Sequence, residues 1–79
     1  MKITSWNVNG LRSVIRKGAL DWFRINQPDV ICFQEIKAYP HQIDYSTIHW
    51  LEEYIPFWHS AERPGYSGVV TFTKEKPVS

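Results

Sequence analysis

The feature that most constrains the fold of this chain is an uninterrupted apolar run at residues 30–33 (Val-Ile-Cys-Phe), which leads into polar residues. A run of this length is typical of a strand covered on both faces, as strands in parallel sheets are. Residues 1–8 also indicate a strand, because Trp6 and Val8 fall on one face and polar side chains on the other. A helical segment separates the two, so we predict a parallel pair joined by a right-handed crossover.

That intervening segment is predicted to be a helix between about Ser13 and Asn26. Ala19, Trp22 and Phe23 recur at helical spacing and would form its apolar face. Gly18 weakens the middle of the segment, which leaves open a regular helix that begins only after it. The proline two residues past the segment stops the helix.

A second amphipathic helix is predicted around Ile43–Tyr54, with Glu52 and Glu53 facing water. Its apolar stripe consists of Ile43, Thr47, Trp50, Leu51 and Tyr54. Two short strands are expected at residues 57–60 and 69–73, joined by a loop rich in turn formers. The order of these elements predicts an α/β fold with a mixed sheet. So few residues would leave one sheet face poorly covered, which indicates half a domain.

Composition and net charge exclude fewer functions than the order of apolar and polar residues does. The net charge is only +1 over 79 residues, so the strongly basic character of many nucleic-acid-binding domains is absent. Residues 12–24 carry four basic side chains against one acidic one, which suits either a phosphate or a solvated helix face. Cys32 is the only cysteine and is expected in the core rather than as a reactive thiol. With no signal peptide and no apolar stretch of membrane-spanning length, we expect a cytoplasmic protein without a membrane partner.

Polar side chains follow the two strands that are predicted to be parallel. Asn7 and Asn9 end the first strand, and Gln34 and Glu35 end the second. Ligands bind at this edge of open α/β sheets, and one carboxylate among amides suits a hard cation such as Mg²⁺. From spacing alone, an exposed Glu35 that merely ends a strand remains the more frequent outcome, because no metal-ligand motif is matched.

Three blocks of sequence resemble the exonuclease III (apurinic/apyrimidinic endonuclease) family. They are residues 5–12 (Ser-Trp-Asn-Val-Asn-Gly-Leu-Arg), residues 34–37 (Gln-Glu-Ile-Lys) and residues 65–69 (Gly-Tyr-Ser-Gly-Val). The segments 18–22 and 28–32 between them are also typical of that family, and the likeness is loosest between residues 38 and 53. This resemblance implies the amino-terminal half of a two-sheet α/β sandwich of the deoxyribonuclease I-like type. Residues 1–79 would then be the amino-terminal part of a single endonuclease/exonuclease/phosphatase domain.

The resemblance also implies roles for individual residues. Glu35 would be the direct metal ligand and Asn7 would line the metal and phosphate site, with Mg²⁺ as the ion and Mn²⁺ as the alternative. Arg12 would lie near the DNA backbone. Lys37 would help balance charge beside the metal ligand and would also be a DNA-binding residue. The DNA-contacting loop would include Gly65 and Tyr66. A part for Asn9 in metal binding stays open, because family members carry Asp or Asn there.

Each of these residues also has an ordinary structural interpretation. Asn7 suits a turn-forming amide, Arg12 a solvated helix start, and Tyr66 a half-buried strand residue. Ile36 stands where the family usually has Thr, and we expect its side chain to point away from Glu35. The three histidines, His41, His49 and His59, match none of the family's catalytic motifs. We expect His49 and His59 to be surface or half-buried packing residues.

By resemblance, the complete enzyme cleaves double-stranded DNA at abasic sites and removes nucleotides from 3′ ends, and is monomeric. The activating Asp, an active-site Tyr and a late Asp-His pair of that family lie beyond this chain, so the 79 residues alone are predicted to be inactive. Three alternatives remain: another metallophosphoesterase of the same fold, a non-catalytic DNA-binding or interaction module, and a truncated gene product.

Overall fold

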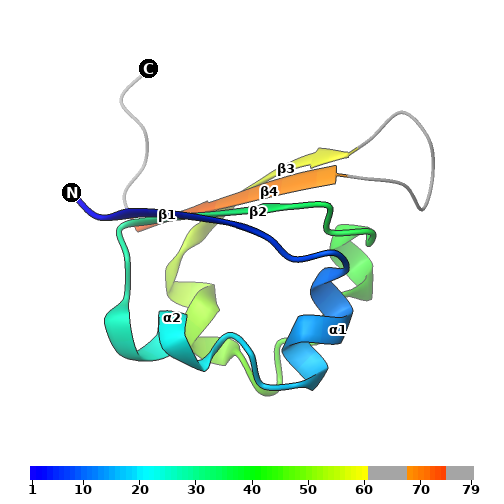
Figure 1. Ribbon diagram of the computed structural model, residues 1–79, viewed down its shortest axis with the longest axis horizontal. Coiled ribbons are helices and arrows are strands. Elements are labelled where there is room, and N and C mark those ends of the chain that lie inside the picture. The colour runs from blue at the N-terminus through cyan, green and yellow to red at the C-terminus, as the bar shows by residue number, and fades with distance from the viewer. Residues whose placement is uncertain (61–67, 75–79) are drawn as a thin grey trace.

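The computed structural model describes residues 1–60 and 68–74, and it contains a four-stranded mixed sheet in the order β1-β2-β4-β3 (Figure 1). The strands are β1 (Ile3–Asn7), β2 (Val30–Gln34), β3 (Ile55–Ser60) and β4 (Gly68–Thr73). As predicted, β1 and β2 are parallel, with Asn7 opposite Gln34 at their carboxyl ends. β4 runs antiparallel to both β2 and β3. The mixed α/β architecture expected from the order of elements is therefore confirmed.

The segment between β1 and β2 forms two short helices, α1 (Leu11–Arg16) and α2 (Asp21–Asn26), rather than one regular helix. Gly18 has a φ of 71°, a conformation that breaks a right-handed helix. The expected apolar face was also partly wrong, because Ala19 and Trp22 are exposed and only Phe23 is buried. The buried side chains of α1 explain why a helix forms before the glycine as well as after it.

The α-helix expected over Ile43–Tyr54 is absent from the structure. Two 3₁₀ helices, η1 (Pro40–Gln42) and η2 (His49–Glu53), stand in this region instead. The carboxylate of Asp44 accepts a hydrogen bond from the backbone N–H of Ser46 at 2.9 Å, a local turn that competes with helix formation. Apolar residues of the segment still reach the core, namely Ile43, Ile48, Leu51 and Tyr54. Thr47, which the helical pattern placed among them, is exposed.

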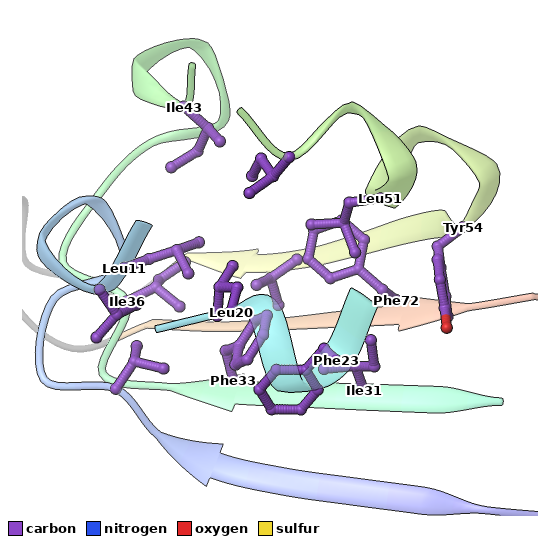
Figure 2. Packing of buried hydrophobic residues seen from close by; sticks show 14 residues of the cluster. Leu11, Leu20, Phe23, Ile31, Phe33, Ile36, Ile43, Leu51, Tyr54 and Phe72 are labelled. Carbon is purple, nitrogen blue, oxygen red and sulfur yellow. The ribbon is translucent and has the colours of Figure 1, made fainter. Parts of the chain in front are cut away.

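The hydrophobic core lies between the sheet and the helices, which all cover the same face of the sheet (Figure 1). Phe33 is fully buried at the centre of this layer, in edge-on contact with Phe23 and Phe72 at centroid separations of 5.4 and 6.2 Å (Figure 2). Burial alternates along β2 and β4, so their other face is only partly covered by the described residues. The apolar run at 30–33 is thus covered fully on one face only, because its neighbouring elements all lie on that side.

Cys32 lies on the less covered face and is half-buried, so its expected place in the core was wrong. Its Sγ accepts a hydrogen bond from the side-chain amide of Gln34 at 3.2 Å. The odd-numbered positions of β1 carry exposed side chains, and the even-numbered positions are half-buried. Among the described residues, none of the helices has the length and apolar character needed to cross a bilayer.

Candidate metal and phosphate site

The carboxyl ends of β1 and β2 bring Asn7 and Glu35 into contact. Their strands are in register at this point, and the backbone N–H of Val8 donates to the carbonyl of Gln34 at 3.0 Å. The side-chain amide of Asn7 donates to Oε2 of Glu35. The juxtaposition predicted from parallel pairing is therefore present, although the roles assigned to these two residues stay predictions.

Backbone hydrogen bonds clamp the segments that follow the two strands. Gly10 and Leu11 donate to the carbonyls of Glu35 and Ile36 at 2.8 and 2.9 Å, and Ile36 donates to the carbonyl of Gly68 at 3.2 Å. The ladder thus continues past the regular strands and joins the end of β1, the end of β2 and the start of β4. Because both sides of the clamp are main chain, the position of Glu35 is fixed by the fold rather than by its own side chain.

This clamp forces an uncommon backbone conformation on three non-glycine residues. The φ angles of Asn9, Glu35 and Lys37 are 47°, 52° and 50°, all in the left-handed region. Such conformations cost on the order of 1–3 kcal/mol each and persist only where surrounding structure enforces them. Asn is well tolerated there, whereas Glu and Lys are not favoured. Strain of this kind clusters at functional sites, which supports the choice of this edge as the site.

Lys37, Asn9 and Arg12 form a second set of contacts beside the carboxylate. The ammonium of Lys37 donates to Oδ1 of Asn9 at 2.6 Å, and the backbone N–H of Asn9 donates to Oδ1 of Asn7 at 3.2 Å. Arg12 donates from Nη2 to the carbonyl of Lys37 at 3.3 Å and is otherwise exposed. Sequence reasoning placed Lys37 toward DNA, and it did not anticipate this internal amide partner. The two cations nevertheless lie on the same side of the site, where a phosphate is expected.

The donor set fits a hard cation that keeps much of its water shell. Glu35 is half-buried, its Oε2 accepts from Asn7, and its Oε1 has no hydrogen-bond partner among the described residues. Residues 1–60 and 68–74 contain no group of three or more His, Cys, Asp and Glu side chains that would enclose a metal. Mg²⁺ characteristically binds through one or two carboxylates and completes its shell with water and substrate phosphate. A single carboxylate with one oxygen outside these hydrogen bonds is consistent with that mode of binding, whereas the side-chain oxygens of Asn7 and Asn9 accept internal hydrogen bonds.

Ile36 and Gly68 support the site from the core side. Ile36 is 2% exposed, so it points away from the site as predicted from the alternation. A Cβ at Gly68 would lie 3.3 Å from Cγ1 of Ile36, which leaves little space for a larger residue. The sequence block 65–69 contained this glycine, but no role for it was anticipated. The predicted DNA contacts Gly65 and Tyr66 lie outside the described residues.

The described histidines do not contribute to the site. His41, His49 and His59 are exposed and none hydrogen-bonds to Glu35 in the described part of the chain. Of the two positions expected for His49 and His59, surface or half-buried, the structure shows the surface one. A cavity of about 500 Å³ has Arg12 in its lining, together with residues between 15 and 21 and between 42 and 48, but Glu35 does not line it.

The fold and this edge define a class of α/β protein that binds its ligand where parallel strands end. Residues 4–79 match the Endonuclease/Exonuclease/phosphatase family, and the chain belongs to that family. The sequence is 42% identical to an exodeoxyribonuclease of Bacillus subtilis over 79 residues, which is 99% of this chain and 30% of the relative. It is 40% identical to the DNA repair nuclease APEX1 of Danio rerio over 100% of this chain and 26% of that protein.

Solved structures agree with the sequence relatives. An AP endonuclease from Archaeoglobus fulgidus superimposes with a TM-score of 0.74 at 28% identity, covering 98% of this chain and 28% of that one. A 3′ phosphatase from Neisseria, bound to product DNA hairpin, gives a TM-score of 0.73 at 26% identity, with 98% and 28% covered. The chain therefore has the fold of the AP endonuclease and exonuclease proteins, and it spans less than a third of the length of these relatives.

Proposed function

We propose that the protein is a DNA-repair phosphodiesterase that acts on double-stranded DNA, as an abasic-site endonuclease and a 3′-to-5′ exonuclease. The observation that carries this proposal is the contact between Asn7 and Glu35 where β1 and β2 end, with Arg12 and Lys37 on the same edge. Family membership supports it, as do relatives named as an exodeoxyribonuclease and a DNA repair nuclease. The cytoplasm as its location and a monomeric state for the complete enzyme remain part of this proposal.

In this proposal Glu35 is the direct ligand of Mg²⁺, with Mn²⁺ as the alternative ion. Oε1 of Glu35 is the oxygen available to the ion, since Oε2 accepts from Asn7. When bound, such an ion stabilises the negative charge that develops on a phosphoryl group under attack. Asn7 orients the carboxylate and lines the active site beside it. The Asn7 amide also couples Glu35 to the backbone of Asn9, so all three would respond together to an ion.

Arg12 is proposed to hold a DNA phosphate next to the metal. Among the residues that the structure describes, its guanidinium has one hydrogen bond, to the carbonyl of Lys37, and the remaining N–H groups are on an exposed side chain. Phosphate contacts of this kind set register and orientation without reading sequence. Lys37 is proposed to contribute its positive charge to the same backbone while its hydrogen bond holds Asn9. Gly65 and Tyr66 complete the proposed DNA contacts.

The described residues around Glu35 offer no general base. Its contacts are an amide and backbone groups, and the imidazoles lie elsewhere on the surface. Activation of water requires a group of suitable pKa within hydrogen-bond reach of the attacking atom. We therefore predict that a purified 79-residue chain does not cleave DNA, whereas the complete protein does.

The test is cleavage of a labelled duplex that contains one abasic site, in Mg²⁺ and in EDTA. We expect the complete protein to cut on the 5′ side of the lesion only with the metal, and the isolated 79-residue chain to leave the duplex intact. Faster hydrolysis of phospholipid head groups than of abasic DNA would instead favour another metallophosphoesterase of this fold. DNA binding without cleavage, unchanged by Mg²⁺ or by Glu35→Ala, would favour a non-catalytic DNA-binding module.

A further inference from the structure

Two exposed aromatic side chains stack on each other a few residues beyond Glu35 in the chain. The rings of Tyr39 and His41 are almost parallel, with an interplanar angle of 6° and centroids 5.8 Å apart. Both residues are exposed, and Tyr39 retains 37% of its accessible surface. The other close aromatic contacts in the described residues involve at least one ring of the core, whereas this pair lies outside it. The core therefore does not account for the presence of these two rings.

The turn that carries the pair is held rigidly. The backbone N–H of Tyr39 donates to the side-chain carbonyl of Gln42 at 2.8 Å, and the N–H of Gln42 donates back to the carbonyl of Tyr39 at 2.9 Å. Pro40 fixes the backbone between the two rings, and buried Ile43 anchors the turn to the core at its far end. Because little conformational freedom is left, a ligand that stacks here would cost little further ordering of the protein.

The turn lies at the same end of the sheet as Glu35. Tyr39 follows Lys37 by two residues, and Arg12 donates to the carbonyl of Lys37. Figure 1 shows the η1 turn, in green, beside α1 and at the end of the sheet where β1 and β2 terminate. The aromatic pair is therefore adjacent to the two cations that are proposed to hold the DNA backbone.

Cations that track a phosphate backbone beside exposed aromatic rings are the combination that binds unpaired nucleotides. Each base has two flat faces, and stacking on an aromatic side chain contributes about 1–3 kcal/mol per base regardless of its identity. A base inside an intact duplex has both faces covered by its neighbours, so only an unstacked base can use such a ring. No acidic side chain lies in the turn formed by residues 39–42 to repel a nucleic acid.

We propose that Tyr39, backed by His41, is a stacking platform for an unpaired base of the DNA substrate. This inference rests on the proposed DNA function, and it identifies the part of the substrate that the turn recognises. His41 covers one face of the Tyr39 ring and the base takes the other. The platform favours DNA in which pairing is already broken, as it is opposite an abasic site or at a frayed 3′ end. Tyr39 is thus a specificity residue that does not touch the reacting phosphate.

The experiment uses the complete protein and DNA that carries the fluorescent base 2-aminopurine, with EDTA present to prevent cleavage. One DNA places this base unpaired opposite an abasic site, and the other places it within a fully paired duplex. We expect the wild-type protein to quench the unpaired base on binding. Tyr39→Leu should lose that quenching and weaken binding of the unpaired DNA about tenfold, the lower end of the range for one stacked base. Tyr39→Phe should retain both properties, because it keeps the ring.

Trp22→Leu is the matched control, since it removes an exposed aromatic ring from α2, which lies at the opposite end of the sheet from α1 (Figure 1). It should leave both affinities within about twofold of wild type, and so should Tyr39→Leu on the fully paired duplex. Absence of quenching in the wild-type protein would overturn the platform whether or not Tyr39→Leu folds. Equal loss of affinity for both DNAs would also overturn it if the circular dichroism of Tyr39→Leu matches that of the wild-type protein. If the wild-type protein bound neither DNA, the proposed DNA function itself would fail, which is a distinguishable result.

Discussion

Replacing Glu35 by Gln tests whether this carboxylate holds the metal. The substitution removes one negative charge but keeps the size and branching of the side chain, and its carbonyl oxygen still accepts from the amide of Asn7. The left-handed backbone at this position, with φ of 52°, is retained as well. We therefore expect the variant to fold like the wild-type protein, so that any change in metal binding reflects the charge.

The magnitude follows from the charge and from the exposure of the site. A unit charge and a divalent ion about 4 Å apart attract by about 2 kcal/mol in bulk water, and by about four times that at the effective dielectric constant near a protein surface. Glu35 stays partly exposed to solvent, and the ammonium of Lys37 places a positive charge on nearby Asn9, so the lower value is the better guide. About 2 kcal/mol corresponds to about a 30-fold rise in the Kd for Mg²⁺.

Isothermal titration calorimetry with Mg²⁺ measures this Kd, and the paramagnetic resonance of Mn²⁺ gives an independent value. Glu53→Gln is the matched control, since it makes the same charge change at an exposed position in η2. We expect the control to alter the Kd by less than about twofold, because exposed charges that are separated by more than a Debye length are screened. Equal weakening in both variants, or unchanged affinity in Glu35→Gln, would refute Glu35 as the direct ligand.

Three further predictions concern the framework of the complete protein. Tyr54→Phe removes a hydrogen bond of 2.6 Å to the buried carbonyl of Pro28, so urea denaturation should show a loss of about 1–3 kcal/mol in unfolding free energy. The pKa of Asp29 is lowered chiefly by the backbone N–H of Lys2, so its carboxylate stabilises the fold above its unfolded pKa of about 3.9. That stabilisation disappears as the pH falls through the lower folded pKa, and acid denaturation of Asp29→Asn should therefore depend less on pH in this window. Gln27 ends α2 with φ of 43°, so Gln27→Gly should raise the unfolding free energy by about 0.5–1 kcal/mol while Gln27→Ala should not, as thermal unfolding would show.

The strands could be predicted because their signals are local. Alternating polar and apolar residues, together with continuous apolar runs, predicted β1, β2 and β4. Parallel pairing of the first two followed from the helical segment between them. The two helices were less predictable, since a single glycine decided where the chain would leave the helical conformation. Between residues 43 and 54 the spacing of apolar residues suited a helix, but the turn at Asp44 competed successfully. Ile43, Leu51 and Tyr54 of the predicted stripe are still buried, whereas Thr47 is exposed and Ile48 is buried instead. In this segment the spacing of apolar residues predicted which side chains are buried better than it predicted the secondary structure.

At the site, sequence reasoning could bring Asn7 and Glu35 together, because parallel strands in register must end side by side. It could not assign the contact between Lys37 and Asn9, or the one between Arg12 and the carbonyl of Lys37. Those contacts depend on left-handed backbone at residues whose intrinsic preference is for other conformations. Of these positions, only the Asn-Gly dipeptide at 9–10 is a sequence pattern that indicates a turn.

Backbone strain beside Glu35, and the contacts that offset it, explain how the side chains of the site are held in place although one face of the sheet is only partly covered. A left-handed φ at Glu35 and at Lys37 costs on the order of 1–3 kcal/mol each, and neither of these two side chains is itself fully buried. The offset comes from backbone hydrogen bonds that Gly10 and Leu11 make to this loop, and from buried Ile36 between the two strained residues. Because Ile36 is buried in the core, the residues that flank it, Glu35 and Lys37, are directed away from the core. The carboxylate is positioned by main chain and core together, so the site does not require cover on the open face of the sheet to hold its geometry.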